Sequence, residues 1–139
     1  MRSLTFRLFL LSLSLPLLMG CEGEIANLPT TPDPVIVTDT FTGTINVNGA
    51  ATHNVFTAAT GTVSATLTSL GDTPPEKVGF SMGTLAGSTC NVVLHNDNAV
   101  VTSNLTGSVQ SLAGSICVRV YDVGAMTESV SYTFTVTHP

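Results

Sequence analysis

The sequence predicts an all-β domain, an antiparallel jelly-roll-like β-sandwich of about seven or eight strands. Two observations predict it. After residue 39, apolar residues alternate with Ser and Thr at period two, and short clusters of Gly, Asn, Asp and Pro separate the alternating segments. No segment there has the 3.6-residue period of an amphipathic helix. About 100 residues are long enough to bury a stable core.

The individual strands are expected where the alternation is clearest. The segment 130–136 places Val, Tyr and Phe on one face and Ser and Thr on the other, so one face contacts the core and the other contacts water. In chain order the expected strands are 41–47, 52–57, 63–68, 78–82, 89–94, 100–105, 115–122 and 130–136. Turns are expected at 48–49, 61, 71–75, 83, 87, 96–98, 107, 114 and 124.

The aromatic residues divide into two groups by the same alternation. Those on the inner phase of the strands are expected in the core; they are Phe41, Phe80, Tyr132 and Phe134. Phe56 and Tyr121 are left unassigned between core and surface.

Residues 1–20 have the pattern of a secretory signal peptide. Arg2 and Arg7 precede an apolar run over 8–18, and the segment ends at Gly20. The run is shorter than the roughly 20 apolar residues that span a bilayer, and Pro16 interrupts it, so a permanent transmembrane helix is the weaker interpretation.

The residues 18–21, Leu-Met-Gly-Cys, resemble the lipobox of bacterial lipoproteins. The resemblance implies that Cys21 carries a diacylglyceryl thioether, that cleavage follows Gly20, and that a further acyl chain such as palmitate joins the new amino group. Several acyl chains together anchor a protein stably. Glu22 stands where inner-membrane retention uses Asp, so the resemblance favours the outer membrane. Ordinary secretion with an unmodified Cys21 is the alternative.

Residues 21–38 are expected to form a tether rich in Pro and Thr, and 39–139 the folded domain. Removal of Arg2 and Arg7 with the leader leaves two cations and nine carboxylates, a net charge of −7. Such a surface has no Lys/Arg stripe to neutralise phosphates, so nucleic-acid binding and adhesion to anionic lipid are disfavoured.

Three cysteines are an awkward number in an exported protein unless one is modified. With Cys21 lipidated, Cys90 and Cys117 are expected to form a disulfide in an oxidising compartment. The alternative, a reactive thiol or a metal pair, lacks the CxxC spacing or neighbouring His that such chemistry needs.

From Asp39 to His138 the domain resembles the bacterial pre-peptidase C-terminal (PPC) domain. The resemblance rests on Asp-Thr-Phe-Thr-Gly at 39–43, a strand near 53–57, Gly-Thr-Val-Ser-Ala-Thr-Leu at 61–67, Gly-Ser-Ile-Cys-Val-Arg-Val-Tyr at 114–121 and the final alternating strand. Members of that family are jelly-roll-like β-sandwiches appended to secreted peptidases. The resemblance implies the sandwich fold and a role in secretion, stability or substrate binding.

The residues 79–83, Gly-Phe-Ser-Met-Gly, match the GxSxG pattern of serine hydrolases, and Asp97 or Asp122 and then His138 follow in the order of that catalytic triad. The motif requires a strand-to-helix turn, which an all-β chain does not offer. Alternation instead gives Ser81 an ordinary place within a strand. A serine hydrolase is therefore only a remote alternative.

The remaining polar residues are expected to have structural roles. His53, His95 and His138 are predicted to be surface residues, because their spacing fits no metal site. Arg119 is expected to pair with a carboxylate on a neighbouring strand. Asp39, Asp97 and Asp122 are weak calcium candidates, with Asn48, Asn96 and Asn98 as further oxygen donors, although no run of residues concentrates the ligands.

These patterns contain no paired acid and base, metal cluster or phosphate loop. They favour a non-catalytic, lipid-anchored module of the cell envelope with a protein-interaction or structural role and no cofactor. The alternative is a carbohydrate-binding or adhesive module, for which the absence of Trp is unfavourable. The expected partners are the membrane, through the lipid anchor, and an envelope protein or polysaccharide.

Overall fold

The computed structural model describes residues 32–111 and 114–139. The predicted signal peptide, the lipidation site Cys21 and most of the tether lie outside the described residues. Pro32 to Pro139 form one compact unit with a core of their own. The first strand begins at Val37, two residues before the start predicted for the domain.

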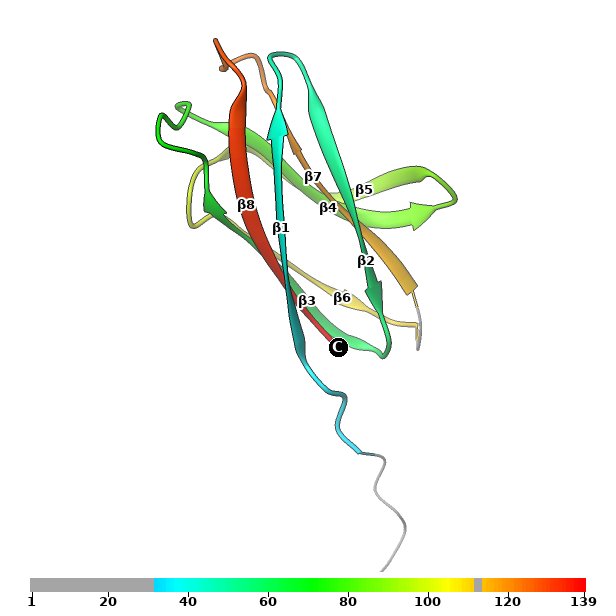
Figure 1. Cartoon of the computed structure of the whole chain (residues 1–139). Coiled ribbons are helices and arrows are strands. Elements are labelled where there is room, and N and C mark those ends of the chain that lie inside the picture. The colour runs from blue at the N-terminus through cyan, green and yellow to red at the C-terminus, as the bar shows by residue number, and fades with distance from the viewer. Residues whose placement is uncertain (1–31, 112–113) are drawn as a thin grey trace, which may run out of the picture. The chain divides into compact units, whose positions relative to one another are not determined.

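Within the described residues, eight strands form two antiparallel sheets that pack as a sandwich, which confirms the predicted fold class (Figure 1). The strands are β1 (Val37–Ile45), β2 (Ala50–Thr57), β3 (Gly61–Ser69), β4 (Val78–Ala86), β5 (Thr89–Ala99), β6 (Asn104–Val109), β7 (Gly114–Tyr121) and β8 (Val130–His138). The first sheet has the order β1-β8-β3-β6 and the second sheet the order β2-β7-β4-β5. Among the described residues, no helix is long and apolar enough to cross a membrane.

The strands pair in a nested order, β1 with β8, β2 with β7, β3 with β6 and β4 with β5. This is the arrangement of a jelly roll, in which a long antiparallel hairpin is wrapped into two sheets. The first strand therefore pairs with the last along its whole length, from Val37 opposite His138 to Ile45 opposite Val130. Figure 1 shows β1 and β8 side by side and the C-terminus beside the start of β1.

The core lies between the two sheets and is built from the inward positions of the alternating strands. In β8, every second residue from Val130 to His138 is buried and the residues between them are more exposed. Phe80, Tyr132 and Phe134 are buried as expected, and Phe41 packs against the core at its margin. Phe56 is exposed on the outer face of β2.

The structure corrects the predicted turn at Gly83 and the strand and turn bounds predicted between residues 96 and 107. The Asn-Asp-Asn segment at 96–98, predicted as a turn, lies inside β5 at a register shift. The segment 100–105, predicted as a strand, is largely a turn between β5 and β6, because the amide of Ser103 donates to the carbonyl of Val100 and Thr102 adopts a φ of 80°. Gly83 and Gly107, predicted as turn residues, lie inside β4 and β6.

Cys90 and Cys117 form a disulfide, as the sequence predicts. It joins the start of β5 to β7, and β4 lies between these two strands in the sheet order. The two cysteines are 27 positions apart in the sequence, so the bond closes a loop and restricts the conformations of the unfolded chain.

Replacing both cysteines, Cys90→Ser with Cys117→Ser, should lower the free energy of unfolding by about 3 to 4 kcal/mol, because the loop-closure entropy returns to the unfolded chain. Urea denaturation of the folded unit measures the change. The oxidised wild type treated with a reductant should lose the same amount. An unchanged unfolding midpoint would show that the bond contributes nothing to stability.

Candidate functional site

A concavity lies at the edge of the sandwich where β5 and β6 face each other. The two sheet orders put β1 and β2 at one side edge of the sandwich, and β6 and β5 at the other. At the second edge a groove of about 390 Å³ opens between the sheets. We call it the β5/β6 groove; it is lined by Val63, Met82, Gly83, Thr84, Val93, Leu94, Gly107, Ser108, Val109, Gln110, Ser111, Gly114, Ser115 and Ile116.

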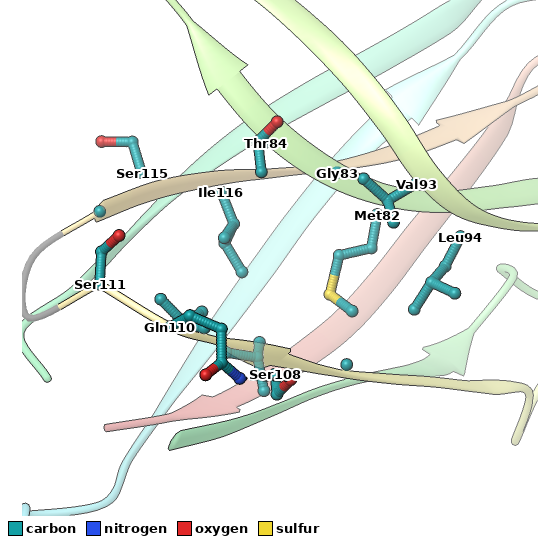
Figure 2. Close-up of a pocket in the computed structure, with 14 residues that line it drawn as sticks. Met82, Gly83, Thr84, Val93, Leu94, Ser108, Gln110, Ser111, Ser115 and Ile116 are labelled. Carbon is teal, nitrogen blue, oxygen red and sulfur yellow. Dashed lines mark hydrogen bonds between the residues drawn. The ribbon is translucent and has the colours of Figure 1, made fainter. Parts of the chain in front are cut away.

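The walls of the β5/β6 groove are apolar and its rim is polar but uncharged. Figure 2 shows the side chains of Met82, Leu94 and Ile116 pointing from the second sheet towards β6. Ser108 lies on β6, and Gln110 directly follows that strand. None of the lining residues is an acid, a base or a histidine. An apolar concavity with a few polar groups is the usual form of a binding site in proteins.

Gly107 keeps the β5/β6 groove open. A Cβ atom at this position would lie 3.3 Å from Cε of Met82 and 3.4 Å from Cδ1 of Leu94, both of them groove residues. Any larger side chain on this inward position of β6 would therefore extend into the space between the sheets. A glycine in a strand often marks such a close approach.

The opposite edge, between β1 and β2, is closed by a cluster of rings. His53 of β2 reaches across the sandwich, and its Nε2 lies 2.6 Å from the hydroxyl of Tyr132 on β8. The His53 ring also lies 5.2 Å from the Phe41 ring and 5.3 Å from the Phe134 ring, between centroids. The histidine thus belongs to the margin of the core, and its prediction as a surface residue is wrong.

Burial shapes the electrostatics of this ring cluster. Desolvation lowers the pKa of His53 and raises the pKa of Tyr132, so both groups favour their neutral forms. In that state the tyrosine hydroxyl can donate to the unprotonated ring nitrogen. Tyr132 has room because Gly43 lies directly opposite it in the β1–β8 ladder, where a Cβ atom would come within 2.7 Å of the tyrosine Cζ.

The residues of the GxSxG pattern do not assemble a catalytic triad. Ser81 lies within β4, buried on the outer side of the strand, and its hydroxyl has no hydrogen-bond partner among the described residues. Its ladder neighbours are His95 on β5 and Arg119 on β7. His138 lies instead in β8 of the first sheet, where it is buried with Nε2 3.1 Å from Oδ2 of Asp39. The prediction of a surface histidine is correct for His95 and wrong for His138.

Arg119 makes no ion pair with a carboxylate within the described ranges, so that prediction is wrong. Its guanidinium lies over the ring of Tyr121 on the same strand, 5.8 Å from the centroid. The Tyr121 hydroxyl donates to Asp97 at 2.5 Å. Desolvation, and then this hydrogen bond, raises the pKa of Tyr121 to about 12. The neighbour of the Arg119 guanidinium is therefore the Tyr121 ring and not a carboxylate.

The three calcium candidates have separate partners. Asp39 faces His138, Asp97 accepts from Tyr121, and Asp122 accepts four backbone N–H groups. The bond from Asn48 and those from 124–126 lower the pKa of Asp122, and they hold the β1–β2 turn against the loop after β7. No group of three metal-ligating side chains occurs in the part of the chain that the structure describes. The structure does not bring these carboxylates together.

Sequence reasoning missed the β5/β6 groove and the His53–Tyr132 contact. Both depend on which strands become neighbours across the sandwich, and alternation does not encode that. The one available signal was glycine on the inward phase of two strands, at Gly43 and Gly107. No protein-family model matches this chain, and no curated protein matches it.

The close approach of Gly43 to Tyr132 predicts that Gly43→Ala lowers the free energy of unfolding by about 1 to 3 kcal/mol, as overpacking of a core does. Gly114→Ala is the matched control, because a Cβ there meets only ordinary contacts, the nearest at 3.5 Å. Chemical denaturation of both variants checks the difference. Equal stability of the two variants would contradict the proposed packing.

The lowered pKa of His53 predicts that stability falls with acid. The unfolded chain takes up a proton near its ordinary pKa of 6.5, before the folded protein does, so the contribution of the neutral ring is present above pH 6.5 and is lost as the pH falls through the lower, folded value. Between pH 6.5 and about pH 5, the melting temperature of the wild type should fall more steeply than that of His53→Gln. Parallel curves would contradict it.

Proposed function

We propose that this chain is a non-catalytic, lipid-anchored β-sandwich of the bacterial cell envelope whose folded domain binds another envelope protein. The observation that carries the proposal is the β5/β6 groove, an apolar and uncharged concavity at an open edge of the sandwich. The hydroxyl of Ser81, the nucleophile of the one catalytic pattern in the sequence, is buried and has no base within hydrogen-bond distance in the described residues. Binding therefore explains the domain better than hydrolysis does.

The envelope location rests on the sequence. The leader 1–20 and the lipobox-like residues 18–21 support export and lipidation of Cys21, and Glu22 favours the outer membrane. The resemblance to the PPC domain supports an accessory role outside the cell. Anchoring through lipid leaves the whole folded surface free for a partner, with the tether as spacer.

A protein partner is favoured over a polysaccharide by the placement of the aromatic rings. Sugar-binding platforms use exposed aromatic faces. Phe56, 63% exposed on β2, is the only large aromatic residue strongly exposed among the described residues. Tyr121 lies against Gly79, its ladder partner, and its hydroxyl is bonded to Asp97. The carbohydrate-binding alternative therefore has one ring rather than a platform.

Affinity capture tests the proposal. The folded unit 32–139 is immobilised and exposed to native envelope extract and to purified polysaccharides, in calcium and again in EDTA. We expect a specific protein to be retained in both media, because the groove has no charged or metal-binding residue. Retention of a polysaccharide alone would favour the alternative module. The absence of any capture by a correctly folded unit would contradict a binding function.

A further inference from the structure

We propose that the β5/β6 groove binds an extended, uncharged peptide segment of the partner, which adds to the free edge of β6 as a fifth strand of the first sheet and places alternate apolar side chains in the groove. The inference rests on the proposed function and names the chemistry of the partner's binding segment. Strand addition combines main-chain hydrogen bonds with pockets for alternate side chains.

The free edge of β6 is the first observation. One side of β6 pairs with β3 through six consecutive residue pairs without a register shift, and its other side has no strand neighbour in the described residues. The sequence of β6, Asn-Leu-Thr-Gly-Ser-Val, has no charge and no proline. Charges, prolines and bulges are among the devices by which edge strands avoid pairing with other chains. β6 has none of these three.

The facing edge strand differs from β6 in this respect. β5 has two register shifts against β4, near Val93 and near the Asn-Asp-Asn segment at 96–98. Lys77 also donates to Asn98 beside the second shift. Bulges interrupt a ladder and protect an edge. An incoming strand would therefore pair with β6 and contact β5 only through side chains.

The apolar lining of the groove is the second, independent observation. Side chains on a strand alternate between two faces, so every second side chain of a strand beside β6 would point between the sheets. There it would meet Met82 and Leu94, which already point towards β6 (Figure 2). Val93, 68% exposed at the groove, would be covered. Burial of this apolar surface would contribute to binding.

The charge distribution indicates which residue types the partner's peptide segment contains. The groove has no ionisable lining residue, whereas the folded domain as a whole is strongly acidic. A carboxylate on the segment would be repelled by the domain and would lose its hydration in the groove, and a lysine would find no carboxylate among the lining residues to pair with. The occupant that fits is a strand with residues such as Val, Leu or Ala at alternate positions and no charge between them.

The test uses a synthetic peptide of about eight residues, close to the length of β6, with Val alternating with Thr and a short polyethylene glycol tail for solubility. Its binding to the folded unit 32–139 is measured by calorimetry, and the amide exchange of β6 by NMR. A control peptide has Asp in place of the central Val. We expect saturable binding of the first peptide, slower exchange of the β6 amides, and at least about tenfold weaker binding of the control.

Two protein variants locate the site. Val93→Asp places a charge at the groove, whereas Phe56→Asp places the same charge at a comparably exposed position on the outer face of β2. Both positions are exposed, so both variants should fold. We expect Val93→Asp to weaken binding at least about tenfold and Phe56→Asp to leave it unchanged. Gly107→Leu, which fills the groove from β6, should act like Val93→Asp.

Three results would overturn the inference. The first is that the alternating peptide shows no saturable binding, and the second is that Val93→Asp and Phe56→Asp weaken peptide binding equally. The third is a dimer of the folded unit that Val93→Asp disrupts, because a second copy of the chain would then occupy the edge. The inference and the proposed function fail separately. A partner protein captured equally well by wild type and Val93→Asp would leave the function standing and overturn the groove as its site.

Discussion

The pairing of β1 with β8 determines what the rest of the sandwich can do. The first strand lies along the last for nine residue pairs, and the strands between them continue the same nested pairing within two sheets. Both ends of the folded chain are then held in the same sheet. The nested order also leaves four edge strands, β1 and β2 on one side of the sandwich and β5 and β6 on the other. Every candidate site follows from how these two edges are closed.

The β1/β2 edge of the sandwich is closed and the β5/β6 edge is open. The difference comes from what fills the space beside an inward-facing glycine at each edge. Beside Gly43 the ring of Tyr132 occupies that space, hydrogen-bonds to His53 and closes the β1/β2 edge with Phe41. Beside Gly107 only the tips of Met82 and Leu94 approach, and the space between the sheets stays open. Covering apolar surface at an edge of the sandwich removes it from water, which is favourable. One edge is closed by the chain's own rings, and the other is the edge at which we propose that a partner binds.

Alternation was sufficient to predict the fold class and most strands, because a half-buried strand has period two whichever strand becomes its neighbour. It failed at 96–105, where Asn and Asp side chains usually signal a turn but here accompany a bulge within β5. It also failed for His53 and His138, whose partners Tyr132 and Asp39 are distant in sequence. Local pattern determines whether a residue faces inwards, but the strand order determines what it meets there.

Site-specific photocrosslinking in living cells tests whether the domain meets its partner at the open β5/β6 edge. A photoreactive residue is placed at Val93 in the full chain, and in a separate strain at Phe56 on the outer face of β2. We expect a discrete protein adduct from position 93 and none from position 56. Adducts from position 56 alone, or none from position 93 in cells where the protein is present and folded, would contradict it.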